Sequence, residues 1–235
     1  MVRTMHPLNT TARVAGFLYL VVVISGFFSL MYAPGKLFVP GDASAMASNI
    51  LAHESLFRAN IIVGLFSELF FIATVLALYQ LLKGTGPQLA MLMVLLVLLD
   101  APLGFASIAN DVAALTFLHG ADFLAVFDPA QRNALAILLL KNGQGIFVSE
   151  MFWGLWLFPL GLLVYRSGFV PRLLGVWLII NGVAYVVLSA TGLLWPEYSK
   201  MISTIATPVL LGEVAFTLWL LVVGVRMPRS PVAMT

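Results

Sequence analysis

Six long apolar stretches alternate along the chain with short polar segments that are rich in glycine and proline. The stretches cover residues 14–32, 61–82, 89–118, 146–164, 173–194 and 202–225. Crossing about 30 Å of hydrocarbon at about 1.5 Å per residue requires roughly 20 residues of α-helix, and each stretch meets this length. The pattern therefore predicts an all-α membrane protein with six transmembrane helices.

Two of the intervening segments carry signals for shorter helices. Asp42 has the position of an N-cap for a helix that ends near Ser55, and Asp128 is followed by Pro129, which is favoured at the first helical position. Both helices are too short to span a bilayer, so we expect two short surface helices on the outer side of the membrane. Residues 1–235 then form a single membrane domain.

The composition agrees with a membrane location. Hydrophobic residues make up 61% of the 235 residues and charged residues only 9%, against roughly 25% in soluble domains. The first stretch is longer than a signal-peptide core of roughly 7–15 residues and lacks a small-residue cleavage site, which predicts a retained helix. The lipid bilayer is therefore an expected partner. The net charge of +2 is spread over single basic residues, which gives no reason to expect a nucleic-acid partner.

The basic residues favour one orientation in the membrane. If the amino terminus is cytoplasmic, the inner segments carry seven basic residues and the outer segments five, and the inner segments contain no acidic residue. We therefore predict that both termini are cytoplasmic. The inner set is Arg3, Arg13, Lys83, Arg166, Arg172, Arg226 and Arg229, and the outer set is Lys36, Arg58, Arg132, Lys141 and Lys200.

Five of the ten acidic residues lie inside the predicted spans. They are Glu68, Asp100, Asp111, Glu150 and Glu213. An ionisable group near the bilayer centre is costly unless it is paired, hydrated or protonated, so such residues usually face the interior of a helix bundle. Counting about 1.5 Å per residue along each span places all five between the midplane and the outer surface. Asp100, Ser107 and Asp111 also share one helical stripe, which predicts a polar path from the outside.

Two interpretations of these carboxylates remain open. They can be structural, either protonated or hydrogen-bonded to Arg58 or to the amides of Asn60, Asn110, Asn142 or Gln144. Alternatively, they line an outward-facing cavity that binds or transports a cation, a proton or a cationic small molecule, with the glutamates as central ligands and the aspartates on the entry path. We favour the cavity because all five share one leaflet. The candidate ligand-binding set is the five acids with Asn60, Asn142 and Arg58.

Catalytic motifs are weak in this sequence. His53-Glu54 is not followed by histidine at position 57, so the helical zinc-protease motif is absent, and neither G-x-S-x-G nor a P-loop occurs. His53 and His119 are weak candidates for a metal site with carboxylates. A metal-dependent intramembrane enzyme that acts on a lipid-like substrate is the second functional hypothesis, and an accessory membrane subunit is the third. No catalytic residue or cofactor is indicated.

Four segments carry a further pattern. They are RVAGFLY at 13–19, VPGDA at 39–43 with Phe57-Arg58 closing that loop, YRSGFVPRLLG at 165–175, and Gly212-Glu213. With these segments the chain resembles, over nearly its whole length, the bacterial membrane family described as domain of unknown function 4386. The resemblance implies a multi-pass protein of the bacterial cytoplasmic membrane and implies no activity.

The chain also predicts an internal duplication. Glu68 follows Asn60 at the same spacing at which Glu150 follows Asn142, and a serine precedes each glutamate. Each segment comes after an aspartate-capped surface helix and is followed by a basic loop, a proline and another span. We predict parallel repeats over residues 42–118 and 128–194, which would place the two glutamates at similar depth on opposite sides of one cavity.

Overall fold

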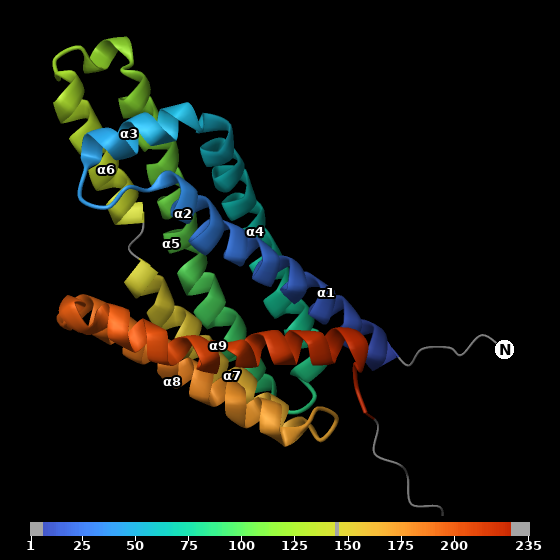
Figure 1. The fold of residues 1–235 in the computed structure, drawn as a ribbon. Coiled ribbons are helices and arrows are strands. Elements are labelled where there is room, and N and C mark those ends of the chain that lie inside the picture. The colour runs from blue at the N-terminus through green and yellow to red at the C-terminus, as the bar shows by residue number, and fades with distance from the viewer. Residues whose placement is uncertain (1–6, 144–145, 227–235) are drawn as a thin grey trace, which may run out of the picture.

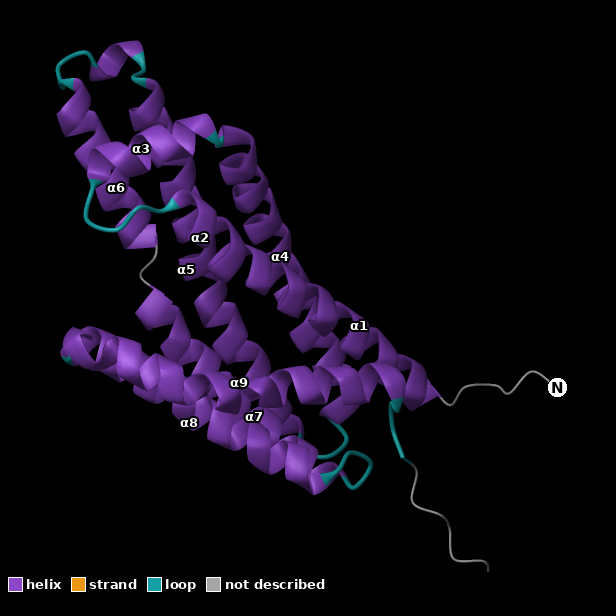
Figure 2. Cartoon of the chain, viewed as in Figure 1, coloured by secondary structure: helices purple, strands orange, loops and turns teal. Residues whose placement is uncertain are grey.

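The computed structural model describes residues 7–143 and 146–226, and the regular elements in these ranges are all helices (Figure 1; Figure 2). The all-α prediction is therefore confirmed. The helices are α1 (Pro7–Phe27), a π-helical turn η1 (Phe28–Tyr32), α2 (Ala33–Leu37), α3 (Ala43–Ala52), α4 (Glu54–Leu82), α5 (Pro87–His119), α6 (Pro129–Gly143), α7 (Ile146–Ser167), α8 (Arg172–Leu194) and α9 (Ser199–Val222), with 3-10 turns at Asp122–Leu124 (η2) and Pro196–Tyr198 (η3).

Within the described ranges, six helical segments are long and apolar enough to cross a membrane. They are Pro7–Leu37, Glu54–Leu82, Pro87–His119, Phe147–Ser167, Arg172–Leu194 and Pro196–Val222. Each contains one of the apolar stretches found in the sequence, or nearly all of it. The prediction of a six-span membrane protein is therefore confirmed.

The first span continues past Pro34, although the first apolar stretch ends at Tyr32 and a proline usually ends a helix. A proline inside an α-helix cannot bond the carbonyl four residues earlier, and its ring presses on that carbonyl. Here the chain passes through the π-helical turn η1, where the N–H of Ala33 donates to the carbonyl of Phe28, directly before Pro34. Because this wider turn changes the hydrogen-bond register at the proline, the helix continues to Leu37 instead of ending at Tyr32.

The six spans form a closed ring in which each helix packs against the next. The order is α1, α4, α5, α7, α8 and α9, and α9 returns to α1. The interior contains the buried side chains of Tyr19, Leu78, Trp156 and Phe216. Large apolar side chains such as Ile24 on the outside of the ring are exposed, as a surface covered by lipid requires.

Glycines allow the closest helix contacts in the ring. Gly154 and Gly161 of α7 face Gly182 and Gly175 of α8, and a Cβ built on any of the four would lie 2.8 Å or less from the opposite backbone carbonyl oxygen. Gly16 of α1 lies equally close to the backbone of α9. Small residues at such contacts let membrane helices approach closely. The α7–α8 pair and the α1–α9 closure therefore have no space for a larger side chain.

A second apolar core lies where α4 and α5 continue beyond the ring. Buried Leu37, Ile50, Phe57, Leu118 and Leu140 bring α2, α3, α4, α5 and α6 together there. Both predicted N-caps are confirmed at the level of hydrogen bonds. Asp42 Oδ1 accepts from the N–H of Ala45 at 2.9 Å, and Asp128 Oδ1 accepts from the N–H of Gln131 at 2.8 Å. Whether these short helices lie on a membrane surface stays a prediction.

The opposite end of the ring gathers the described chain ends and two short loops. Figure 1 shows the start of α1, the end of α9, the α4–α5 loop and the α7–α8 loop on the same side of the molecule. Three cationic side chains lie over aromatic rings here, in the pairs Lys83 with Tyr79, Arg172 with Tyr165, and Arg226 with Trp219. We call this the basic end, because the sequence has no acidic residue in these segments.

Candidate functional site

Glu213 of α9 is directed into the ring and contacts side chains of two neighbouring helices. The hydroxyl of Tyr19 on α1 donates a hydrogen bond to Glu213 Oε2, and Tyr185 and Asn181 of α8 approach the same carboxylate. Tyr19 is itself buried, and its ring centre lies 5.9 Å from that of Trp156. The carboxylate of Glu213 therefore lies among polar groups of α1 and α8.

The backbone of α9 next to Glu213 is fixed by α8. The indole of Trp177 packs so closely on Gly212 that any side chain there would collide with it. Its Nε1 donates to the carbonyl oxygen of Val209 at 2.9 Å, and Asn181 Nδ2 donates to the carbonyl oxygen of Leu210 at 3.2 Å. The Gly212-Glu213 pair thus combines a close helix contact with a carboxylate directed into the ring.

Asp100 of α5 is only 3% exposed and has one oxygen without a hydrogen-bond partner. Trp153 Nε1 of α7 donates to Asp100 Oδ2 at 2.8 Å, and Ser149 also approaches this carboxylate. No partner reaches Asp100 Oδ1 among the described residues. Since a buried acceptor without a donor is costly, this oxygen is available for a ligand or a proton.

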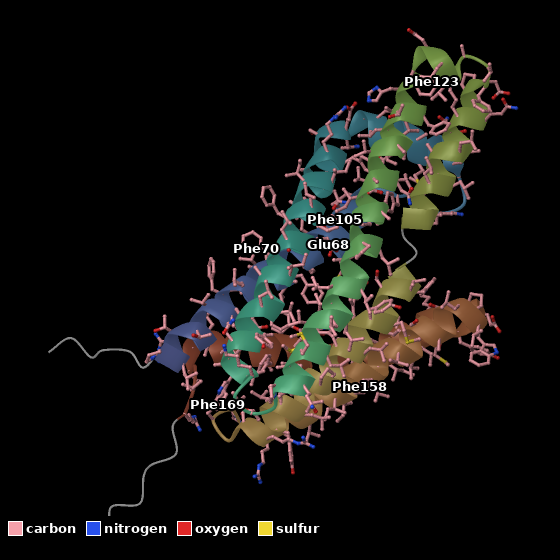
Figure 3. The ribbon with its side chains drawn as sticks, turned by 180° about the vertical axis from the view of Figure 1, so that it is seen from behind. Glu68, Phe70, Phe105, Phe123, Phe158 and Phe169 are labelled. Carbon is pink, nitrogen blue, oxygen red and sulfur yellow. The ribbon has the colours of Figure 1, made fainter. Side chains whose placement is uncertain are left out.

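Glu68 of α4 packs against Gly104 of α5, which has no side chain and so leaves space for the carboxyl group. A Cβ built on Gly104 would overlap the Glu68 carboxyl group. Figure 3 shows Glu68 at the junction of α4 and α5, beside Phe105. The carboxyl group is near enough to Asp100 for the two to interact electrostatically. The preceding Ser67 accepts a hydrogen bond from Ser25 of α1 at 2.9 Å, so this part of α4 also contacts α1.

Glu150 of α7 lies near Tyr185 of α8, which is also close to Glu213. Tyr185 is close enough to interact with both Glu150 and Glu213, and its ring lies edge-on to Trp153 with centres 5.9 Å apart. Glu150 Oε2 is buried without a partner among the described residues. The side chain of Asn142, the proposed counterpart of Asn60, lies outside the described part of the structure.

Asp111 occupies a separate polar position nearer the end of α5 that joins the second apolar core. Gly64 lies against Ile108 where α4 and α5 pack antiparallel. In that register Asn60 lies opposite Val112, next to Asp111, and Asn60 Oδ1 is buried without a partner among the described residues. Asp111 is about 10 Å along α5 from the contact with Glu68. We use the name acidic cluster for Glu68, Asp100, Glu150 and Glu213, without Asp111.

Arg58 and the two histidines lie outside the acidic cluster. Arg58 Nε pairs with Glu54 Oε1 at 2.6 Å, and His119 Nε2 lies 3.2 Å from Glu54 Oε2. His53 Nδ1 lies 3.0 Å from the carbonyl oxygen of Asn49. In the described ranges, no group of three or more His, Cys, Asp or Glu side chains is arranged to hold a metal ion.

A groove of about 530 Å³ opens between the start of α4 and the end of α5. Arg58, Thr116 and His119 supply its polar lining, and Ile61, Val112 and neighbouring apolar side chains supply the rest. It lies on the same helix interface as Asn60 and Glu68, toward the second apolar core.

Sequence reasoning missed the neutral partners of the carboxylates. The candidate set from the sequence did not include Tyr19, Trp153, Asn181 or Tyr185. One signal was available, because tyrosines in membrane spans usually lie at the interfaces with water. Tyr19 and Tyr185 instead lie well inside their spans, as does Asn181.

The chain belongs to the family described as Domain of unknown function (DUF4386), which it matches over residues 14–224. It is also similar to a protein of Archaeoglobus fulgidus described only as uncharacterized. The two are 29% identical over 164 residues, which cover 69% of this chain and 83% of the archaeal protein. No solved structure is significantly similar to this chain. The family resemblance expected from the sequence is therefore confirmed.

Proposed function

We propose that this DUF4386 protein binds a cation at the acidic cluster inside the membrane, and that the cation is a proton or a cationic small molecule. One observation carries the proposal. Glu213 of α9 contacts Tyr19 of α1 and lies near Tyr185 of α8, which is also close to Glu150 of α7. Asp100 of α5 bonds to Trp153 of α7 and lies near Glu68 of α4, so these contacts link all six helices of the ring. No lysine, arginine or histidine is among the contacts that the described residues make with this cluster.

The charge balance of the cluster favours a cationic ligand. A carboxylate in a low-dielectric interior requires a counter-ion or a proton, and basic side chains are not among its contacts. Three buried acceptor atoms also have no donor among the described residues, namely Asp100 Oδ1, Glu150 Oε2 and Asn181 Oδ1. An ammonium group carries three donors and a positive charge, which would satisfy both requirements together.

The aromatic neighbours favour an organic monocation over a hard divalent ion. Trp153 and Tyr185 lie between the carboxylates, and Phe71 stacks edge-on against Trp156 with ring centres 5.2 Å apart. Ring faces attract weakly hydrated cations. Calcium and magnesium instead bind through oxygen ligands, to which these rings contribute only the Tyr185 hydroxyl.

We propose further that the site opens toward the outer side through the α4–α5 interface. The polar positions Asn60 and Asp111 and the groove near Arg58 follow one another along this interface. The two short loops of the basic end are flanked by basic residues, Lys83 at one and Arg166 and Arg172 at the other, which supports cytoplasmic termini in the cytoplasmic membrane.

Benzylammonium is a suitable probe, because it combines a donor-rich cation with an aromatic ring. Its binding to purified protein in phosphatidylcholine nanodiscs is measured by calorimetry and by the intrinsic fluorescence of the five tryptophans, of which Trp153 contacts Asp100. We expect saturable binding that Asp100→Asn or Glu213→Gln weakens by roughly 10- to 100-fold, since hydrogen bonds to charged groups are worth about 1.5–3 kcal/mol.

Glu197→Gln is the matched control, because Glu197 is exposed at the start of the same span as Glu213 and should not affect binding. A proton-uptake titration of the same proteins tests the proton alternative. The proposal is wrong if folded wild-type protein and the Asp100→Asn and Glu213→Gln variants are indistinguishable in both benzylammonium binding and proton uptake.

A further inference from the structure

Three arginines converge at the α7–α8 loop. Arg166 ends α7 and Arg172 begins α8, and the loop between them turns at Gly168, whose φ of 72° suits glycine. The C-terminal segment crosses this loop, since the N–H of Arg226 donates to the carbonyl oxygen of Phe169 at 2.9 Å. Figure 3 labels Phe169 at this end of the bundle. The fold thus brings Arg226 to the loop that Arg166 and Arg172 flank, although it lies more than fifty residues further along the chain.

A hydrogen bond to α1 holds the C-terminal segment in this position. Asn9 Oδ1 accepts from the N–H of Val225 at 3.1 Å, directly after a turn at Gly224 with a φ of 71°. The place of Arg226 beside the loop is therefore set by the backbone of two chain segments.

The three arginines have no acidic partner among the described residues. The two ion pairs found there both involve Glu54, at the other end of the molecule. All three side chains are exposed. Their charge must therefore be balanced by something outside the described chain.

Two of the guanidinium groups are stacked in a way that leaves their donors free. Arg172 lies 5.4 Å from the ring centre of Tyr165, and Arg226 lies 4.5 Å from the ring centre of Trp219. A guanidinium that stacks through its face keeps its N–H donors at its edge, where they can bind a phosphate through two parallel hydrogen bonds. Tyrosine and tryptophan rings of this kind mark the headgroup level of a bilayer.

An apolar stripe continues from this arginine cluster along α8. Leu173, Val176, Ile180, Val183 and Val187 recur at helical spacing and are all exposed, with Leu173 at 73%. A chain of hydrocarbon can cover such a stripe, whereas a soluble phosphate cannot.

We infer that Arg166, Arg172 and Arg226 bind the headgroup of an anionic glycerophospholipid whose acyl chain lies along the exposed stripe of α8. The charge of the arginines selects the phosphate and any second negative group, and the stripe supplies the apolar contact. This inference is independent of the acidic cluster, which lies deeper in the ring.

Competition between two lipids tests the inference. Purified protein in detergent is incubated with equal amounts of dioleoylphosphatidylglycerol and dioleoylphosphatidylcholine, and the retained lipid is measured by native mass spectrometry. We expect the wild type to prefer phosphatidylglycerol, and Arg166→Gln/Arg172→Gln/Arg226→Gln to reduce that preference by roughly 100-fold, as about 1 kcal/mol for each of three basic residues implies.

Lys36→Gln/Lys141→Gln/Lys200→Gln is the matched control, because it removes the same charge from exposed lysines elsewhere. It should leave the preference unchanged. If the triple arginine variant does not fold, the three single variants are compared, and each should reduce the preference. Equal loss in both triple variants, or no loss in any arginine variant, would overturn the inference. Glycerol 3-phosphate is added in a further competition. If it displaces the retained phosphatidylglycerol at equal concentration, a lipid ligand is refuted.

Discussion

Gly104→Ala is predicted to destabilise the protein through its contact with Glu68. A Cβ at this position would overlap the Glu68 carboxyl group and would meet no other side chain as closely. Because that carboxyl group ends a flexible side chain, the helices need not separate. The carboxyl group would instead be displaced from its place near Asp100. The substitution therefore tests whether Glu68 is directed at α5, as binding in the ring interior requires.

The expected magnitude follows from three contributions. Forcing a side chain away from its rotamer costs about 0.5–1.5 kcal/mol, and overpacking a well-packed contact typically costs about 1–3 kcal/mol. Replacing glycine by alanine inside a helix returns about 1 kcal/mol. We therefore expect a net loss of about 0.5–3.5 kcal/mol in the wild type. In a Glu68→Ala background the overlap is gone, so the same substitution should stabilise the protein by about 0.5–1 kcal/mol.

A double-mutant cycle measures this difference as a change in the free energy of unfolding in detergent micelles. Gly64→Ala is the control at the same helix interface, because a Cβ there would meet only Ile108, at 3.7 Å. It should be neutral or stabilising in both backgrounds. The reasoning is refuted if Gly104→Ala behaves like Gly64→Ala, or if its effect is the same with and without the Glu68 side chain.

Three further predictions concern other contacts and the topology. Tyr19→Phe should lower the free energy of unfolding by about 1.5–3 kcal/mol by removing the donor to Glu213, whereas Tyr165→Phe, at an exposed tyrosine of the basic end, should have little effect in the same unfolding assay. Gly161→Ala should lower the free energy of unfolding by about 1–3 kcal/mol because the backbone of α8 cannot move away from the new methyl group. Gly26→Ala faces open space and should cost nothing, so equal thermal shifts for the two variants would contradict this prediction. Single cysteines at Ser48 and Ala130 should react with an impermeant thiol reagent added to intact cells, and those at Lys83 and Ser167 should not; the reverse pattern would invert the proposed orientation.

The number and type of the spans could be predicted from the sequence, but their ends could not. Hydropathy detects the part of a helix that lies in hydrocarbon. The observed α4 begins at Glu54, seven residues before the apolar stretch, because its first turns are polar and include the pair of Glu54 with Arg58. The sequence does not show that the first helix continues past Pro34. The π-helical turn that allows this depends on packing and leaves no mark in composition.

The acidic members of the candidate site could be predicted, but their partners could not. A carboxylate in an apolar span is visible in the sequence because its cost is intrinsic to the residue. The bond from Tyr19 to Glu213 instead joins the first and last spans, and it depends on the ring closing between α1 and α9. The same holds for Trp153 and Asp100, since the sequence does not say that α5 and α7 are neighbours.

The ring also bears on the proposed internal duplication. A short aspartate-capped helix, a long helix, a basic loop and a second long helix occur in order as α3, α4 and α5 and again as α6, α7 and α8. The two short helices pack together, and the first long helix of each unit contributes a glutamate to the acidic cluster. The units differ in length, because α4 and α5 have 29 and 33 residues whereas α7 and α8 have 22 and 23. We propose that the longer first unit carries the second apolar core beyond the ring, while α1 and α9 fill the gap between the units and bring Tyr19 to Glu213. On this view the duplication supplies Glu68 and Glu150, and the two added helices complete the site with the groups that no repeat contains.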